Sequence, residues 1–577
     1  MKKSISICSI CGVVLLLSLF VPFVSCIKQN GKNNPDFKSD SLVAHFDYFN
    51  YKGDDDFYKL NPLPDKDYYY NPILPGWYSD PSLCSNGKDF FLVTSTFSFF
   101  PGVPIFHSTD LVNWKQIGHV LNRPGQLPLD GQRVSEGIFA PAISYNPHNK
   151  TYYMVTTNIR KGNFFVKTTD PFGEWSDPIS LPNVKGIDPS FFFDEDGKAY
   201  IVNNDVPDGG SQYEGHRAIR VLQFDVEKEE TFGPSIMLVN GGVNLDEKPI
   251  WIEGPHMYKI NGNYYLMCAE GGTSVNHREV IFKGDNPIGS FKPWAKNPML
   301  TQRHLEPDRD LPITCAGHAD LIKKENGEWW SVFLACRPIE NKFENLGRET
   351  YLMPVKWSED GFPYMTEGDE LVPRIVEMKG LERDSMTTFG NFEKYDDFNA
   401  PVLGMEWMTL RGDASDLYSL TTDSGFLTLN CADVESSELK TPAFVSRRLQ
   451  HHKFECKTCM YFKPQSEDES AGILLFKDET HQYLFSVGKK GAQNTISIKK
   501  IKENGADVID SMNVEITDGP IEMKVISDGK NFSFYYAIGQ SDWTLLSNSV
   551  DAYYLSTAQS YGFTGTNIGL YASKKSY

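Results

Sequence analysis

Residues 188–202 read Asp188-Pro-Ser-Phe-Phe-Phe-Asp-Glu-Asp-Gly-Lys-Ala-Tyr-Ile-Val202. Two apolar, aromatic-rich runs flank an Asp-Gly turn, which is the pattern of a β-hairpin. Four other segments share this pattern: a polar or Pro-containing start, an apolar run, an Asn, Asp or Gly turn, and a second aromatic run. They begin at Asp80, Ala140, Glu253 and His318.

The five hairpin segments recur every roughly 50–65 residues, which is close to the period of a propeller blade and leaves room for two more strands in each unit. Five units predict a five-bladed β-propeller over residues 62–385. A β-sandwich with chance hairpins is the alternative. From 386 to 577 short strands alternate polar and apolar residues, as in Tyr483-Leu-Phe-Ser-Val, and predict a second domain that is a β-sandwich. The expected fold class is all-β.

The inner strand of each blade begins beside the central channel, so the first residues of the five segments are expected to meet at one mouth. Asp80, Asp188, Glu253 and His318 would then lie close together. Like charges held close together lower the stability of the fold, so a cluster of carboxylates indicates a function. Three carboxylates suit glycoside hydrolysis, in which one protonated carboxyl donates to the leaving oxygen and an ionised one activates water or attacks directly. A third carboxylate can raise the pKa of the acid.

The composition and the N-terminal sequence indicate which partners and which location to expect for the protein. The net charge of −19 offers no basic excess for phosphates, so nucleic acid is not an expected partner, and a mean hydropathy of −0.38 excludes a multi-span membrane protein. Lys2 and Lys3 precede an apolar run over 7–24, and Phe23-Val-Ser-Cys26 resembles a bacterial lipobox. We therefore expect a lipoprotein signal peptide over 1–26, a lipid on Cys26, a polar tether over 27–61, and a periplasmic or cell-surface protein. An uncleaved signal-anchor helix is the alternative.

The cysteines do not indicate a disulfide framework. Seven lie beyond Cys26, scattered and odd in number. Cys456 and Cys459 form a lone CxxC without the second pair that a zinc site would need, and incidental thiols in a strand are the preferred interpretation. Neither G-x-S-x-G nor H-E-x-x-H occurs, so a serine or zinc hydrolase finds no support.

The sequence resembles family 43 of the glycoside hydrolases. Asn71-Pro-Ile-Leu-Pro-Gly-Trp-Tyr-Ser-Asp80-Pro-Ser is similar to the opening motif of that family. The other matching stretches, in order, are Ser95-Thr-Phe97-Ser-Phe-Phe-Pro-Gly, Asp110-Leu-Val-Asn-Trp114, Gly137-Ile-Phe139-Ala-Pro, Gly186-Ile-Asp188-Pro-Ser, Glu253-Gly-Pro-His, Gly317-His318-Ala-Asp and Leu346-Gly-Arg348-Glu-Thr. The resemblance extends from about residue 68 to the end, and is to the branch of β-xylosidases and α-L-arabinofuranosidases that carries a C-terminal sandwich.

This resemblance implies roles for the acids. Asp80 matches the general base, Glu253 the general acid, and Asp188 the third carboxylate, which tunes and positions the acid. The family inverts, so base and acid are expected about 6.5–9.5 Å apart with water between them. Arg348 matches a sugar-binding cation that could also hold Asp188 or a ring hydroxyl; a surface salt bridge is the alternative.

The resemblance also implies a sugar pocket. Phe97 and Phe139 match positions where relatives present aromatic faces to the sugar, although packing is the alternative for each. Gly562-Phe563-Thr-Gly matches a sandwich loop that closes the pocket, so Phe563 is a further candidate. His318 matches a channel histidine near a bound water or ion; a hydrated Ca²⁺ there and a hydrogen-bonded imidazole are the two interpretations.

The sequence thus predicts an inverting exo-glycoside hydrolase that needs no cofactor and releases terminal β-D-xylose from xylan-derived oligosaccharides. An α-L-arabinofuranosidase or a bifunctional enzyme is the first alternative. The second is a noncatalytic carbohydrate-binding lipoprotein, which the three acids disfavour because a binding protein needs no graded carboxyl groups. Membrane contact is expected only through the lipid on Cys26.

Overall fold

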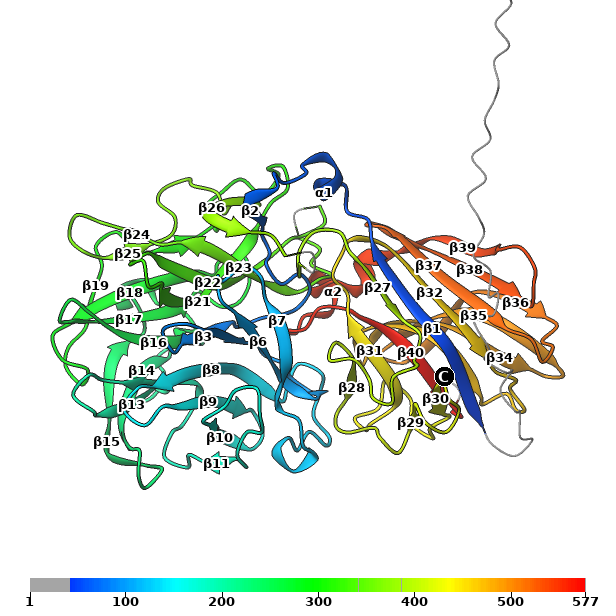
Figure 1. Cartoon of the computed structure of the whole chain (residues 1–577), viewed down its shortest axis with the longest axis horizontal. Helices are drawn as coiled ribbons and strands as arrows, with labels where there is room; N and C mark the ends of the chain where they lie inside the picture. The colour runs from blue at the N-terminus through cyan, green and yellow to red at the C-terminus, as the bar shows by residue number, and fades with distance from the viewer. Residues whose placement is uncertain (1–41, 341, 385–386, 576–577) are drawn as a thin grey trace, which may run out of the picture.

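The structure is a computed structural model that describes residues 42–340, 342–384 and 387–575 (Figure 1). The signal peptide predicted for 1–26, including Cys26, lies outside the described residues. Within them, no helix has the length and apolar character to cross a bilayer. The helices are short: α1 (Asp56–Leu60), α2 (Thr557–Ser560), and the 3₁₀ turns η1 (Pro124–Gln126), η2 (Leu245–Glu247) and η3 (Ala552–Leu555).

The first lobe is a five-bladed propeller, as predicted. Its innermost strands contact one another in the closed order β3, β8, β12, β16, β21 and back to β3. Blade 1 contains β3 (Ser82–Ser85), β4 (Phe90–Val93), β6 (Gly102–Ser108) and β7 (Lys115–Leu121); blade 2 contains β8 (Ile138–Asn146), β9 (Thr151–Asn158), β10 (Gly162–Thr168) and β11 (Ile179–Ser180). Blade 3 contains β12 (Ile187–Phe193), β13 (Ala199–Asp205), β14 (Ala218–Asp225) and β15 (Glu230–Asn240).

The remaining two blades complete the ring. Blade 4 contains β16 (Glu253–Ile260), β17 (Asn263–Glu270), β18 (Arg278–Gly284), β19 (Lys292–Pro293) and β20 (Leu300–Thr301); blade 5 contains β21 (Thr314–Lys323), β22 (Trp329–Cys336) and β23 (Arg348–Pro354). Two further sheets have two strands each: β2 (Lys66–Tyr70) with β26 (Ile375–Glu382), and β24 (Lys356–Trp357) with β25 (Pro363–Tyr364). The backbone N–H groups of Ile73 and Leu74 donate to Thr350 O, so the start of the propeller is joined to its last blade.

Four of the inner strands contain a β-bulge near their first residues. The ladder register shifts between Phe139 and Ala142, Ile187 and Ser190, Glu253 and His256, and Gly317 and Asp320. The bulged residues include Ala140, Asp188, Gly254 and His318, and all four have positive φ, as does Asp80 at the corresponding point before β3. Bulges re-aim side chains and are frequent beside active sites. Here the same device recurs around the mouth of the channel.

The second lobe is a sandwich of two antiparallel sheets, as predicted. One has the order β29-β30-β1-β32-β37-β38-β39, with β27 paired to β1, and the other has the order β36-β35-β34-β33-β40-β31-β28-β5. Their strands are β1 (Val43–Gly53), β5 (Phe99–Phe100), β27 (Glu393–Asp396), β28 (Met408–Leu410), β29 (Tyr418–Ser419), β30 (Leu427–Asn430), β31 (Ala443–Arg448), β32 (Lys453–Tyr461), β33 (Ser470–Asp478), β34 (His481–Lys490), β35 (Gln493–Lys502), β36 (Gly505–Val514), β37 (Ile521–Asp528), β38 (Asn531–Ile538), β39 (Thr544–Asp551) and β40 (Asn567–Ser573). One apolar core lies between the two sheets.

The prediction of a tether over 27–61 is wrong from residue 43 onward. β1 (Val43–Gly53) is an inner strand of a sandwich sheet, between β30 and β32, and Figure 1 shows it as the long blue strand among the orange ones. Its side chains Phe46, Phe49 and Tyr51 are fully buried in the sandwich core. The Asp and Asn residues that interrupt these aromatics suggested a polar linker, but burial of the aromatics outweighs them. The sandwich therefore uses both ends of the chain.

Strand pairing, hydrogen bonds and a buried ion pair also join the two lobes beside the channel mouth. β5 (Phe99–Phe100) comes from the propeller sequence but pairs with β28 of the sandwich. The backbone N–H of Arg411 donates to Ser98 O, and the buried Arg411 guanidinium pairs with Glu479 and donates to Gln132 O. The loop around Phe97 is thereby fixed from the sandwich side.

Candidate active site

One pocket at the channel mouth contains all eight residues that the sequence analysis singled out. Its volume is about 60 Å³. It is lined by Asp80, Phe97, Phe139, Ala140, Ile187, Asp188, Glu253, Thr273, His318, Arg348 and Phe563. The lining residues come from all five blades and from one loop of the sandwich. Residues nearly 500 positions apart in the chain thus share one small cavity.

Asp80 is held in its ionised form. Its side chain is buried, with Oδ2 accepting a hydrogen bond from Ser95 Oγ at 2.6 Å and Oδ1 lying 3.1 Å from Nη1 of Arg348. Burial alone would favour the neutral acid. The positive charge of Arg348, followed by His318 and the hydrogen bond from Ser95, outweighs burial and holds the pKa of Asp80 below its usual value.

Asp188 and Glu253 are shifted in the opposite direction. Burial, followed by the charge of Asp80, raises the pKa of Asp188 to about 7. Burial, followed by the charge of Asp188, raises the pKa of Glu253 well above its usual value. The two carboxyl groups interact strongly, so their protons belong to the pair. At neutral pH the pocket therefore contains one firmly ionised carboxylate and at least one protonated carboxyl group.

Asp188 and Glu253 occupy different positions relative to the bulges of their blades. Asp188 occupies the bulge of blade 3, whereas the bulge of blade 4 is occupied by Gly254, and Glu253 stands one residue earlier. A Cβ on Gly254 would lie 2.8 Å from the His318 ring, so only glycine fits there. Ile187 is the residue of blade 3 that corresponds to Glu253. The repeat-based alignment of Glu253 with Asp188 was therefore off by one residue; the proline that follows the bulged residue, Pro189 in blade 3 and Pro255 in blade 4, would have given the correct register.

Arg348 is a buried pocket residue, which excludes the alternative of a surface salt bridge. Its ion-pair partner is Asp80, and it also acts electrostatically on Asp188 and Glu253. Its guanidinium carbon lies 5.3 Å from the ring centroid of Phe563 and 5.9 Å from that of Phe97. Nε of Arg348 is buried and has no hydrogen-bond partner among the described residues.

Three phenylalanines form one aromatic wall. Phe97 and Phe563 stack with their centroids 6.0 Å apart, and Phe139 meets Phe97 and Phe563 edge-on at 5.7 and 5.6 Å. Phe563 is positioned by its backbone N–H, which donates to Ser135 Oγ at 2.9 Å. Phe97 and Phe139 thus both pack against a neighbour and line the pocket.

His318 lies in the channel behind Asp80, with Nδ1 4.0 Å from Asp80 Oδ1. Burial lowers the pKa of His318 to about 4, so the imidazole is neutral. His277 Nε2 and Glu279 Oε1, which belong to side chains in contact with the same strand, are buried without a partner among the described residues. These polar atoms fit a hydrated ion or water. A Ca²⁺ bound through water stays a prediction, since His318 would contribute a single nitrogen and Ca²⁺ prefers six to eight oxygens.

Some site residues were missed or set aside by sequence reasoning. Thr273 lies in none of the matching stretches; Ser95 begins one of them, but its role is identified only by its contacts with Asp80 and with the backbone N–H of Ala140. Trp114 belongs to an apolar core that includes residues of blade 1. Trp251 packs under Arg217, whose guanidinium carbon is 4.6 Å from the indole centroid. Arg217 in turn acts electrostatically on Glu253.

Family models match both lobes of the chain. The model of Glycosyl hydrolases family 43 matches residues 69–363, and that of the Beta xylosidase C-terminal Concanavalin A-like domain matches residues 395–577. A xylosidase/arabinosidase of Butyrivibrio fibrisolvens is 38% identical over 512 residues, which are 87% of this chain and 95% of the relative. A non-reducing end alpha-L-arabinofuranosidase of Bacteroides ovatus is 34% identical, over 88% of this chain and 91% of the relative.

A solved structure extends the similarity to three dimensions. The crystal structure of a family 43 protein retrieved from a capybara gut metagenome has a TM-score of 0.86 and 39% identity, covering 92% of this chain and 99% of that one. Both lobes are included in this match. The chain described here belongs to family 43 of the glycosyl hydrolases.

Proposed function

We propose that the protein is an inverting, exo-acting glycosidase that releases terminal β-D-xylose from xylan-derived oligosaccharides. The proposal rests on two pKa shifts of opposite direction within one pocket. The pKa of Asp80 is lowered, and the pKa of Glu253 is raised. Hydrolysis with inversion needs this pair, an ionised base for water and a protonated acid for the leaving oxygen. A noncatalytic binding protein gains nothing from the difference.

In the proposed reaction Asp80 Oδ1 or Oδ2 takes a proton from a water that attacks the anomeric carbon. Glu253 donates its proton to the glycosidic oxygen as the bond to the leaving sugar breaks. Asp188 keeps the proton on Glu253 by its charge and positions it through the hydrogen bond that Asp188 Oδ2 accepts from Gly254 N–H at 3.2 Å. Arg348 keeps Asp80 ionised, and in the proposed reaction its guanidinium also donates to a sugar hydroxyl.

The size and walls of the pocket support action on chain ends. A volume of about 60 Å³ and closure by Phe563 favour a single terminal sugar over a continuous chain. The partly buried rings of Phe139 and Phe563 offer apolar surface to the C–H face of a pentose, and Phe97 stacks on Phe563.

The second candidate is cleavage of terminal α-L-arabinofuranose, alone or in addition. The similar proteins of Butyrivibrio fibrisolvens and Bacteroides ovatus, whose names contain arabinosidase and arabinofuranosidase, favour it. Assays with p-nitrophenyl β-xyloside and α-L-arabinofuranoside separate the two activities. Proton NMR of the first anomer released tests inversion: initial α-xylose from a β-xyloside supports it, and initial β-xylose contradicts it. Absence of nitrophenol with both substrates, together with binding of xylooligosaccharides, would establish the binding-protein alternative.

We propose in addition that the protein is exported and attached to a membrane by a lipid on Cys26. The apolar run over 7–24 and the lipobox-like Phe23-Val-Ser-Cys26 support this. Cells that express Cys26→Ala should incorporate no labelled fatty acid into the protein, whereas the unaltered chain should be labelled. Labelling of both chains, or of neither, would contradict the proposal.

A further inference from the structure

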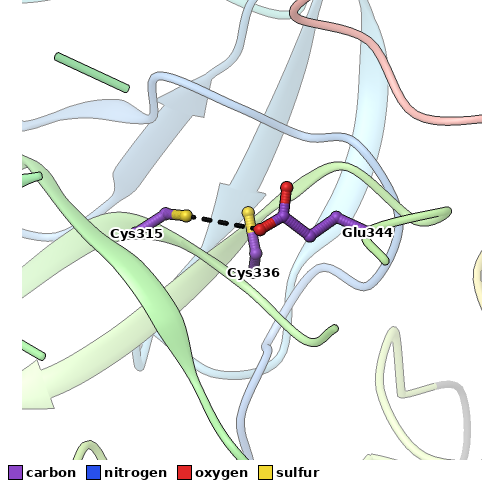
Figure 2. A group of neighbouring side chains, drawn as sticks. All are labelled: Cys315, Cys336 and Glu344. Atoms are coloured by element: carbon purple, nitrogen blue, oxygen red, sulfur yellow. Dashed lines mark hydrogen bonds between the residues drawn. The ribbon is translucent and has the colours of Figure 1, made fainter. Parts of the chain in front are cut away.

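Two cysteines and a glutamate meet on the fifth blade, in a cluster that the proposed mechanism does not use. Cys315 lies on β21 and Cys336 ends β22, while Glu344 lies in the loop that leads to β23. Figure 2 shows the three side chains pointing toward one another. Their ligand atoms all lie within 4.8 Å of one another, and among the described residues no other group of three His, Cys, Asp or Glu side chains does so.

The distances suit a small tetrahedral ion. Cys315 Sγ lies 3.5 Å from Glu344 Oε1. Zn–S bonds of about 2.3 Å and Zn–O bonds of about 2.1 Å at the tetrahedral angle place sulfur and oxygen about 3.6 Å apart. Two thiolates would lie about 3.8 Å apart by the same geometry, and the sulfurs of Cys315 and Cys336 lie within 4.8 Å of each other. Thiolate ligands select Zn²⁺ over the oxygen-preferring Mg²⁺ and Ca²⁺.

The surroundings also compensate the charge that such a site creates. Arg348, the register partner of Cys336 on β23, acts electrostatically on Cys336 and Glu344. Lys477 of the sandwich acts on the same two groups. Two thiolates and a carboxylate around Zn²⁺ carry one net negative charge, which Lys477 offsets, since Arg348 is already paired with Asp80.

The cluster is coupled to the loop that closes the pocket. Glu344 O accepts hydrogen bonds from N and Oγ1 of Thr557, and Lys477 Nζ donates to Thr557 Oγ1 and to Thr564 O. Thr564 follows Phe563 directly. An ion on Glu344 would therefore fix the sandwich segment that presents Phe563 to the substrate.

We propose that Cys315, Cys336 and Glu344 bind one zinc ion, which fastens the fifth blade to the sandwich segment carrying Phe563. Each thiol loses its proton to solvent as its Zn–S bond forms, Glu344 supplies one oxygen, and water completes the four ligands. The proposal does not rest on the glycosidase activity.

Cobalt provides a direct test on the full chain. The protein is stripped of metal, kept reduced by a non-thiol reductant, and titrated with Co²⁺. We expect a thiolate-to-cobalt charge-transfer absorption that saturates at one equivalent and disappears on addition of Zn²⁺. The double variant Cys315→Ser/Cys336→Ser should lose it, whereas Cys84→Ala, which removes a buried thiol from blade 1, should retain it. Glu344→Gln keeps both thiols and should weaken binding at least about tenfold.

Thermal unfolding provides a second readout that does not depend on absorption. Zn²⁺ should raise the Tm of the unaltered chain and of Cys84→Ala but not that of the double variant, because only a folded site binds it. Three results would overturn the proposal: no charge-transfer absorption in the fully reduced chain, the same absorption in the double variant, or a Cys315–Cys336 disulfide without zinc in protein purified without reductant.

Discussion

The backbone N–H of Gly254 donates to Oδ2 of Asp188 at 3.2 Å, so the carboxylate of blade 3 is tied to the residue that follows Glu253. This contact joins the two bulged inner strands at the point where their acids enter the pocket. It orients Asp188 beside Glu253 without neutralising it. Burial, followed by the charge of the nearby Asp188, raises the pKa of Glu253.

Glu253→Gln removes the proton donor while keeping the size of the side chain. Hydrolysis of xylobiose, whose leaving group is poor, should fall about 10²–10⁴-fold. A nitrophenyl glycoside with an activated leaving group needs less protonation and should lose less. The measurement is kcat/KM for both substrates and both proteins, and equal losses would contradict Glu253 as the acid.

Asp80→Asn should stop turnover of both kinds of substrate, because water activation is needed whatever the leaving group. A loss of about 10²–10⁴-fold in kcat is expected. Asp89→Asn is the matched control, since Asp89 is a carboxylate of the same blade that pairs with His107 away from the pocket. Near-normal turnover by Asp80→Asn would remove Asp80 from the role of base.

Asp188→Asn tests the raised pKa of Asp188 through stability. A carboxyl group whose pKa is about 3.9 when unfolded and about 7 when folded binds more protons in the folded state between these values. Below pH 4 this carboxyl group is protonated in both states and does not change the free energy of unfolding. As the pH rises from 4 to about 7, the unfolded state ionises more readily than the folded state, so the free energy of unfolding falls over that window. The variant should therefore lose less stability than the unaltered protein between pH 5 and pH 8.

Denaturant unfolding at the two pH values measures this difference. The expected gain at pH 8 is at most a few kcal/mol, because the proton is shared with Glu253. Activity should fall at the same time, as Glu253 loses the neighbour that keeps it protonated. An identical pH dependence of stability in both proteins would contradict the assignment.

Phe563→Ala opens the sandwich side of the pocket. The contacts of Phe563 with Phe97, Phe139 and Arg348 are lost, and kcat/KM for small glycosides should fall about tenfold, which corresponds to roughly 1.5 kcal/mol for an aromatic contact. Tyr561→Ala is the control, because Tyr561 lies in the same loop and is 79% exposed. Equal effects of the two substitutions would show that Phe563 does not line the substrate site.

Gly254→Ala places a Cβ 2.8 Å from the His318 ring at a residue with φ of +56°. The backbone strain should cost about 1–2 kcal/mol, and the collision should add to it and displace either His318 or Glu253. Gly262→Ala shares a left-handed backbone, with φ of +79°, but has open space around it. We expect Gly254→Ala to lower both Tm and kcat well beyond the effect of Gly262→Ala; similar effects on both would mean that strain alone matters.

The sequence by itself determined the five blades, because each hairpin is a local pattern of aromatic runs around a turn. It also determined the convergence of Asp80, Asp188 and Glu253, since residues at the start of every inner strand must meet at the hub. The C-terminal sandwich followed from alternating short strands for the same local reason.

Only the tertiary structure decided the rest, because each remaining feature depends on partners far away in the chain. β1 (Val43–Gly53) joins the sandwich through pairing with β32, some 400 residues later, and its mixed polar and aromatic sequence does not specify that partner. The folded chain likewise decides that Arg348 pairs with Asp80 and that Glu253 stands one residue before its bulge. Burial and neighbouring charges then set the direction of each pKa shift. Local sequence encodes strands and turns, whereas electrostatic environment exists only once distant segments have packed together.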